Sequence, residues 1–477
     1  MLPIKTKHLR IFLAFACILF IGYQIDNVPR IDDEYLGEQV FWLLKVGKVR
    51  SGLGFADLGY DVYQSIFHKL FVYCGYLACR IGGWSLISLH MVTYLSFLAF
   101  LPLFYAYTRR RYGNIYPAFF LICLTLLLFN QDLLYAAGDF RPEVLIMTLG
   151  FASYVLLMRY LDQGKSAALA GSAIAAGLCM FAHLNGAVFI AAGCLLLLQR
   201  KKYGVVFAYA ALAALAFAPY FADTLYHADL KYFWHQFRHD PILNPDQRWY
   251  ASLLQLANEQ MRFLFTEKQV LLTATLLFVL FTCRQRLRAR QPGLLSYTLF
   301  LVLGLALICP SKSTKYMVLY LPFLYLIITE GWLWLEEQGS RSKVLAIRTL
   351  LLANILVSLV YSAQQINRNV HNLSTGGIIA EHSAIANMVR TQHSRVSLLA
   401  PRLMIFNELP CFKQLMDIER VLPANMSSFL RGSKLDYVIF EKKDKARYDW
   451  TLLEQAPDHL LVPVDSTAHY IITRVNR

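Results

Sequence analysis

Three consecutive carboxylates follow the first apolar segment of the chain. Residues 11–23 are apolar enough to enter a bilayer, and Asp32, Asp33 and Glu34 come shortly after them. A carboxylate at the membrane boundary is costly to desolvate, so it usually pairs with a cation or takes part in chemistry. The alternative is a solvated juxtamembrane loop. The rest of the sequence bears on this choice.

Two further segments carry charged residues at the ends of apolar runs. Arg141 and Glu143 flank Pro142, which suits the first turn of a helix because its missing N–H is not needed there. Arg141 could reach the interface along its aliphatic stem and pair with a nearby acid, or it could anchor a carboxylate or a phosphate.

Lys312 and Lys315 lie in a short turn that the topology below places outside, where short loops carry few cations. Lipid head groups could compensate them, or a diphosphate or lipid monophosphate could bind there. Tyr316 would add a hydroxyl donor.

The histidines give weaker signals. His183 lies in a predicted hairpin at the membrane edge. It could be an interfacial residue with its hydrogen bonds made, or it could act as a base or a ligand. The histidines of the segment 223–268 match no tight metal-binding pattern. We therefore predict no metal site and no certain cofactor, although a divalent cation stays open.

The composition predicts a polytopic membrane protein, with 57% hydrophobic and 14% aromatic residues. Lysine and arginine outnumber the acids, 46 to 31, but the basic clusters lie at the ends of apolar segments. This is the positive-inside pattern, so the excess of basic residues indicates membrane topology and not nucleic-acid binding. Most of the nine cysteines lie inside apolar segments and predict no disulfide framework.

Eleven apolar runs could span the membrane, with basic clusters on one side and the C-terminus outside. They are 9–24, 84–107, 115–131, 142–159, 165–182, 185–199, 204–222, 269–283, 294–310, 316–335 and 344–363. The long external loops would be 25–83 and 223–268, and residues 38–48 could form an interfacial helix.

The composition becomes polar from about residue 364. We expect a transmembrane domain over 1–363 and a small soluble α/β domain over 364–477. In the second, 396–400, 437–440 and 469–475 are predicted strands, and 378–390 and 425–431 are helical or loop elements.

The order of these motifs carries a resemblance. Asp33-Glu34-Tyr35 lies outside the first helix and precedes Gly47, an Arg-Pro-Glu opens a later helix, and Lys312-x-x-Lys315-Tyr316 leads into Leu319–Pro322. The arrangement resembles the GT-C superfamily of polyprenyl-phosphate-sugar glycosyltransferases, nearest the protein O-mannosyltransferase and aminoarabinose transferase branch. It covers residues 9–363, and the order of the motifs is a stronger signal than any one of them.

The resemblance implies an α-helical polytopic GT-C fold and an inverting enzyme whose active site lies on the external face. The family's Asp-Glu motif matches Asp33 and Glu34, with Asp32 as the neighbouring possibility, and Asp33 is the predicted general base. The Arg-x-Glu motif matches Arg141 and Glu143.

The late basic-aromatic motif of the family matches Lys312, Lys315 and Tyr316, which with Arg141 would bind the donor phosphate. Related chains often carry a His/Lys-Pro-Pro segment before the second span, but here His68 and Lys69 stand without prolines. Both are candidate substrate-binding residues, together with Glu143 and His183.

The implied partners are a polyprenyl-phosphate sugar, membrane lipids and a hydroxyl acceptor on lipid A, a glycan or a protein. We expect a bacterial inner-membrane protein whose active site and C-terminal domain are periplasmic. Two other classes stay open: an O-antigen ligase or polymerase with a lipid-diphosphate donor, and a transporter with broken helices and polar residues mid-span.

Overall fold

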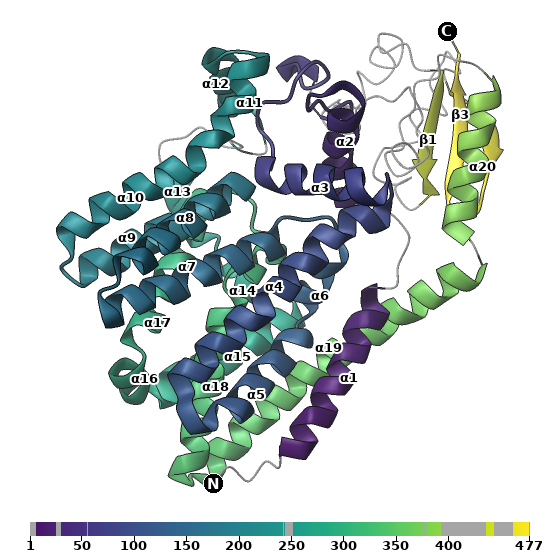
Figure 1. The fold of residues 1–477 in the computed structure, drawn as a ribbon. Coiled ribbons are helices and arrows are strands. Elements are labelled where there is room, and N and C mark those ends of the chain that lie inside the picture. Colours follow the sequence, from purple (N-terminus) through teal and green to yellow (C-terminus); the bar gives the residue numbers. More distant parts are fainter. Residues whose placement is uncertain are drawn as a thin grey trace.

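The computed structural model describes residues 6–24, 30–54, 56–241, 243, 251–375, 377–392, 436–442 and 461–476, most of them helical (Figure 1). Each of the eleven predicted apolar runs corresponds to a helix. These helices are α1 (Thr6–Gln24), α4 (Leu86–Tyr112), α5 (Tyr116–Leu128), α7 (Glu143–Gln163), α8 (Ser166–Ala182), α9 (Ala187–Gln199), α10 (Tyr203–Phe217), α15 (Glu267–Thr282), α17 (Pro292–Ile308), α18 (Leu321–Gln338) and α19 (Arg341–Thr375).

Shorter elements connect the long helices. The α-helices among them are α2 (Ile31–Val46), α3 (Lys69–Gly82), α6 (Gln131–Gly138), α11 (Ala222–His227), α12 (Leu230–His239), α13 (Ala251–Ala257), α14 (Gln260–Leu264), α16 (Arg284–Arg290) and α20 (Gly377–Gln392). The 3₁₀ turns are η1 (Ala56–Leu58), η2 (Gly113–Ile115), η3 (Leu184–Gly186), η4 (Ala218–Phe221) and η5 (Thr314–Leu319).

The chain is a multi-pass membrane protein. Among the described residues, four helical stretches are long and apolar enough to cross a bilayer: Leu86–Tyr112, Glu143–Gln163, Tyr203–His227 and Arg341–His371. Three bent helix pairs raise this number to seven if each pair is one span. Helix length and composition thus support several spans, and the count of eleven stays a prediction.

Small residues let the helices around α8 pack closely. A side chain at Gly177 of α8 would meet the carbonyl oxygen of Ala213 in α10, and one at Gly150 of α7 would meet the ring of Phe189 in α9. Such small-residue contacts are typical of membrane helices, which gain little from the hydrophobic effect against lipid. They fix α7, whose first residues carry part of the site described below.

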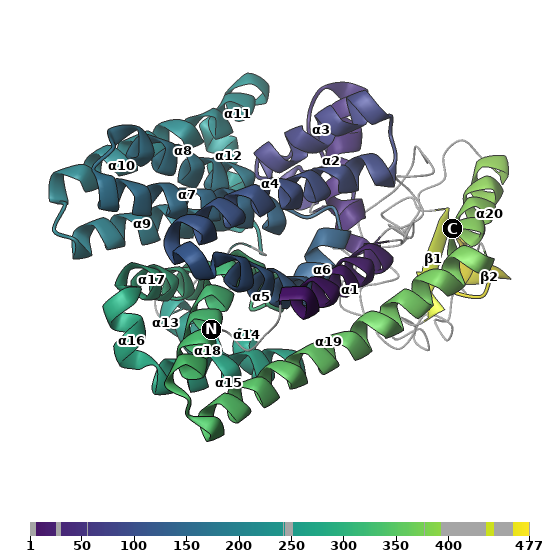
Figure 2. The ribbon, with the colours of Figure 1, turned by 60° about the horizontal axis from the view of Figure 1, so that its bottom comes forward.

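The C-terminal elements pack beside α2 (Figures 1 and 2). The strands β1 (Tyr437–Glu441), β3 (Tyr470–Val475) and β2 (Leu461–Ser466) form an antiparallel sheet in that order. Phe41 of α2 and Leu53 join a buried apolar cluster with residues of α20 and the sheet: Ile385, Ala386, Tyr437, Ile439, Tyr470 and Ile472.

The sequence analysis predicted β1 and β3, left the segment of α20 open between helix and loop, and missed β2. Its segments 396–400 and 425–431 lie outside the described residues. Helix α19 continues without a break past residue 364, where we expected the domain boundary. The division into two domains stays a prediction.

Candidate active site

The three acids lie in the first turn of α2, which begins at Ile31. Negative side chains are favoured there by the helix dipole and by unpaired backbone N–H groups. Successive residues of a helix point about 100° apart, so neighbouring acids face different surroundings. Gly47, with φ 71°, ends α2 in the left-handed region that favours glycine.

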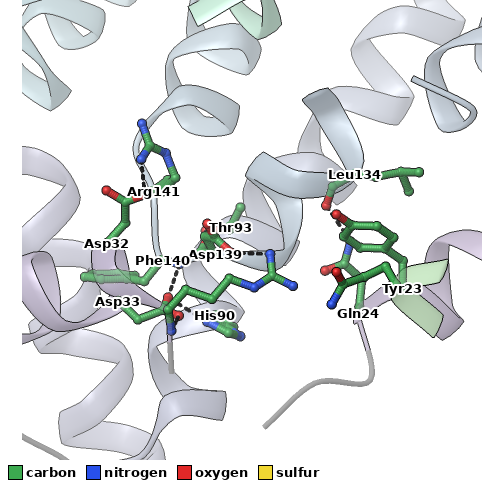
Figure 3. A network of polar contacts seen from close by, with 12 residues as sticks. Tyr23, Gln24, Asp32, Asp33, His90, Thr93, Leu134, Asp139, Phe140 and Arg141 are labelled. Atoms are coloured by element: carbon green, nitrogen blue, oxygen red, sulfur yellow. Dashed lines mark hydrogen bonds and ion pairs between the residues drawn. The ribbon is translucent and has the colours of Figure 1, made fainter. Parts of the chain in front are cut away.

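Asp33 points into the protein and is fully buried (Figure 3). Its Oδ2 accepts the backbone N–H of Arg30 at 2.8 Å, and its Oδ1 accepts that of Phe140 at 2.6 Å. The Nε2 of His90 in α4 lies 2.9 Å from the same Oδ1. Asp33 therefore joins α2 to α4 and to the loop before α7.

A second buried carboxylate lies close to Asp33. Asp139 pairs with Arg30 at 2.5 Å, and the Arg30 guanidinium lies 5.1 Å from the centre of the Tyr135 ring. Burial raises the pKa of Asp139 to about 7; Arg30 opposes this, whereas Asp33 and Asp32 reinforce it. The sequence analysis did not select Arg30, His90 or Asp139, whose partners lie far away in the chain.

Asp32 faces the other way and is partly accessible, with 24% of its side chain exposed. It forms ion pairs with Nη1 of Arg141 and, at 2.7 Å, with Nζ of Lys315. Burial would raise the pKa of Asp32, but Arg141 and Lys315 outweigh it and lower this pKa below its usual value. Asp32 is therefore an ionised carboxylate between two cations.

Arg141 is held in a fixed orientation by Glu143. Its Nε donates to Glu143 Oε2 at 3.0 Å, and its Nη2 donates to Oε1. Glu143 is buried at the first position of α7, and Pro142 precedes it as the N-cap. Such a two-point contact is geometrically specific, so the remaining guanidinium edge is directed at Asp32 before any ligand binds.

Neutral rings border this charged cluster. The imidazoles of His68 and His183 stack with their centres 4.1 Å apart, and Tyr316 packs edge-on against His183 at 5.9 Å. Burial lowers the pKa of His183 to about 3, with Arg141 adding to the effect. Burial also lowers the pKa of His68, reinforced by its neighbour His183, so both rings are neutral at pH 7.

The tautomer of His183 follows from a backbone contact. The backbone N–H of Asn185 donates to His183 Nδ1 at 3.0 Å. In a neutral imidazole the other nitrogen, Nε2, then carries the proton. His183 is thus set to donate a hydrogen bond, not to accept a proton, at its second nitrogen.

Lys312 lies in a separate cluster. Its Nζ donates to Glu259 at 3.1 Å and to the carbonyl oxygens of Ala306 and Cys309 at 2.9 and 3.1 Å. An ammonium has three N–H donors, and these contacts use all three. The structure therefore places Lys315, but not Lys312, against Asp32 with a donor left for a ligand.

Arg262 holds the loop that carries both lysines. This fully buried side chain donates to the carbonyl oxygens of Ser311 at 2.7 Å and Ser313 at 3.2 Å, and it pairs with Glu259 at 2.5 Å. The sequence analysis missed it, because nothing in residues 251–264 marks a side chain that reaches this loop.

Lys69 contacts helix α11 and not Asp32. Nζ of Lys69 contacts Asp223 at 3.3 Å and Thr224 at 2.9 Å, and burial lowers the pKa of Lys69 to about 8 although Asp223 opposes this. Glu34 is fully buried. The described residues include no group of three or more His, Cys, Asp or Glu that could hold a metal ion.

Known proteins were compared with the chain in three ways. No protein-family model and no curated protein matches it. Solved structures do match, and three of them are described here. ArnT from Cupriavidus metallidurans bound to undecaprenyl phosphate has a TM-score of 0.65 at 11% identity, over 98% of each chain.

The Archaeoglobus fulgidus oligosaccharyltransferase in its apo form has a TM-score of 0.59 at 9% identity, over 94% of this chain and 71% of its own. AglB from the same organism, in complex with an inhibitory peptide and a dolichol-phosphate, has a TM-score of 0.54 at 9% identity and the same coverage. The chain therefore has the GT-C fold, which is the fold that the order of its motifs implied. Within this class, it is similar to ArnT over nearly its whole length.

Proposed function

We propose that the chain is a glycosyltransferase that moves a sugar from a polyprenyl phosphate to a hydroxyl acceptor. The observation that carries the proposal is the accessible carboxylate of Asp32 held between Arg141 and Lys315, from three distant parts of the chain. The lipid phosphates in the ArnT and AglB structures support a lipid-linked donor. Glycosyl transfer from a phosphate to a hydroxyl needs a base for the acceptor proton and cations for the charge that develops on the leaving phosphate. A carboxylate beside two cations supplies both.

The donor phosphate binds Arg141 and Lys315 in this proposal. The two cations balance Asp32 and Glu143 in the free protein, and the neutral His68 and His183 add no charge. A phosphodiester competes with Asp32 for the same N–H donors. Glu143 keeps the guanidinium in place during this exchange, so little reorganisation is needed as charge develops on the leaving phosphate.

Asp32 then acts as the general base. Once Arg141 and Lys315 share their N–H donors with the phosphate, the pKa of Asp32 rises because the carboxylate loses part of their stabilisation. The acceptor oxygen attacks the anomeric carbon from the face opposite the phosphate, and its proton passes to Asp32. A carbon–oxygen bond forms to the acceptor, the bond to the phosphate oxygen breaks, and its electron pair leaves with the phosphate, which inverts the anomeric centre.

In this proposal the neutral rings bind the sugar, which is the uncharged part of the donor. The Nε2–H of His183 and the hydroxyl of Tyr316 are donors that could hold a sugar hydroxyl beside the phosphate. His68 keeps His183 in place by stacking. We infer that Asp32, not Asp33, is the base, since both oxygens of Asp33 are occupied by groups that fix the fold.

The proposed setting is a bacterial inner membrane with the site on the external face. In the predicted topology, the three acids and the basic clusters lie on opposite sides of the membrane, as the positive-inside rule expects. The clusters are Arg109–Arg111, Arg200–Lys202 and Arg284–Arg290. Lipid A, a glycan and a protein hydroxyl are the acceptor classes to be tried.

The proposal is tested with purified protein in nanodiscs and a panel of polyprenyl-phosphate sugars, with release of the polyprenyl phosphate followed by mass spectrometry. Asp32→Asn should lower turnover by about 10²–10⁴-fold, the usual contribution of a general base. Asp162→Asn, which removes an exposed ion pair with Arg110, is the matched control.

Turnover at the control rate in Asp32→Asn would refute the assignment of the base. Failure to bind or turn over every donor, with uptake of a solute into proteoliposomes instead, would favour the transporter alternative. Turnover of a lipid diphosphate alone would favour the ligase or polymerase alternative.

A further inference from the structure

A basic helix closes the opposite end of the helix bundle from Asp32. Helix α18 begins just after the turn that carries Lys315 and ends at Gln338, and there Arg286 of α16 lies 3.9 Å from Glu337. Helix α16 joins α15 to α17, and it meets α17 at an angle of 103°. In Figure 1, α16 lies at the lower left and α2 in the upper part of the view.

The arginines of α16 fall into two sets. Arg286 pairs with Glu337, and Arg290 accepts a hydrogen bond at its carbonyl oxygen from Arg111. Arg284 and Arg288 are four positions apart, so they share one face of the helix. Both are exposed, and within the described part of the chain no hydrogen bond or ion pair engages either guanidinium.

A cavity of about 560 Å³ lies beside this face, between α15 and α17. Arg284 and Arg288 line it together with apolar side chains, among them Leu280, Phe281 and Leu299. Phe281 is 80% exposed and Leu299 is 53% exposed, so the apolar wall opens to the surroundings of the protein. The volume lies within the range of sites that enclose a small organic molecule, roughly 300–1,000 Å³.

We propose that this cavity binds one anionic phospholipid, with its phosphate between Arg284 and Arg288 and an acyl chain between α15 and α17. The apolar wall favours a lipid over a free phosphate. The two guanidiniums, which no described residue engages, favour an anionic head group over a neutral one. Basic pockets between membrane helices on the positive side are suited to anionic lipid head groups. The inference does not rest on the proposed glycosyl transfer, because the donor phosphate would bind at the other end of the bundle.

Native mass spectrometry of the purified full-length chain tests the site, with phosphatidylglycerol and phosphatidylethanolamine as probes. The unchanged protein should bind one phosphatidylglycerol about tenfold more tightly than phosphatidylethanolamine, and Arg284→Gln/Arg288→Gln should abolish this preference. The matched control is Arg341→Gln/Lys343→Gln, which removes the same charge from exposed positions at the same end of the bundle. It should keep the preference.

A second variant separates the cavity from charge alone. Ser296→Trp places an indole in the lined volume without changing any charge, and it should weaken phosphatidylglycerol binding by a similar factor. Equal binding of the two lipids by the unchanged protein would overturn the proposal. So would an equal loss in the control variant, or full binding in Ser296→Trp, since these results would indicate a diffuse attraction to the basic surface.

Discussion

Replacing Asp33 by asparagine should destabilise the protein, whereas the same change at Asp32 should spare stability and remove activity. The buried Asp33 carboxylate has three polar contacts, with the N–H groups of Arg30 and Phe140 and with His90. An asparagine has one acceptor oxygen, so its NH₂ group must face at least one N–H donor. At the Oδ2 position, that donor is the Arg30 N–H, 2.8 Å away.

The magnitude follows from these contacts. One lost hydrogen bond to a charged acceptor costs about 1.5–3 kcal/mol, and the two that remain lose their charge assistance, roughly half their strength. The free energy of unfolding of Asp33→Asn should therefore fall by about 3–6 kcal/mol. Asp32 is partly solvated and Arg141 keeps Glu143, so Asp32→Asn should cost about 1 kcal/mol.

Thermal unfolding in detergent, followed by intrinsic fluorescence, compares the two variants with the unchanged protein. Asp33→Asn should unfold several degrees lower, and Asp32→Asn close to the unchanged protein. Donor turnover is measured on the folded fraction of each. If Asp33→Asn kept its Tm and lost turnover while Asp32→Asn remained active, the structural role given to Asp33 would be wrong and the first sequence-based assignment of the base would be correct.

Three further predictions concern the two lysines of the loop before α18, the Arg262 side chain that holds this loop, and Glu38. Glu38 is a buried residue of α2 whose carboxylate accepts hydrogen bonds from the Ser51 hydroxyl and the Gly52 backbone N–H. Lys315→Met should weaken donor binding more than acceptor binding, measured as separate KM values, because the cation faces the phosphate; Lys312→Met should have the smaller effect on donor KM. Arg262→Met should raise donor KM by about tenfold through the loop it holds, an effect that Arg262→Lys should partly rescue. Glu38→Gln should flatten the decrease of Tm with rising pH. Burial raises the pKa of Glu38 to about 7, so the folded state binds more protons than the unfolded state and loses stability as pH rises from about 4.5 to 7.

Each of these has an outcome that would contradict it. An equal rise of donor KM in the two lysine variants would indicate that Lys312 also binds the donor phosphate. A normal donor KM in Arg262→Met would show that Arg262 does not position Lys315. A Tm of Glu38→Gln that still falls with pH as in the unchanged protein would place the responsible carboxyl elsewhere, with Asp139 the next candidate because burial also raises its pKa to about 7.

The sequence predicted the helices well because their signal is local. Each long apolar run satisfies its own backbone hydrogen bonds as a helix, so its place can be read without knowing its neighbours. The strand β2 was missed because Leu461–Ser466 contains Pro463 and alternates weakly, and its pairing with β3 is what defines it. Pairing of this kind is not visible in one strand alone.

The site was predicted at the level of segments, and the choice between neighbours needed the structure. Asp32 and Asp33 have the same chemistry, and only the start of α2 and the position of Phe140 determine which one faces outward. Lys312 and Lys315 are likewise distinguished by Glu259, more than 50 positions earlier in the chain. Sequence spacing holds no information on such partners.

The contact between α2 and the C-terminal sheet has a consequence for biogenesis. Phe41 lies in the same buried cluster as Tyr437, almost 400 positions later. At translation rates of about 5–20 residues per second, the ribosome needs roughly 20–80 s to make the intervening chain. The helix that carries Asp32 is thus inserted with one apolar face uncovered, and its final packing waits for the last strands. Protease protection of α2 in stalled nascent chains should accordingly appear only after β3 has emerged.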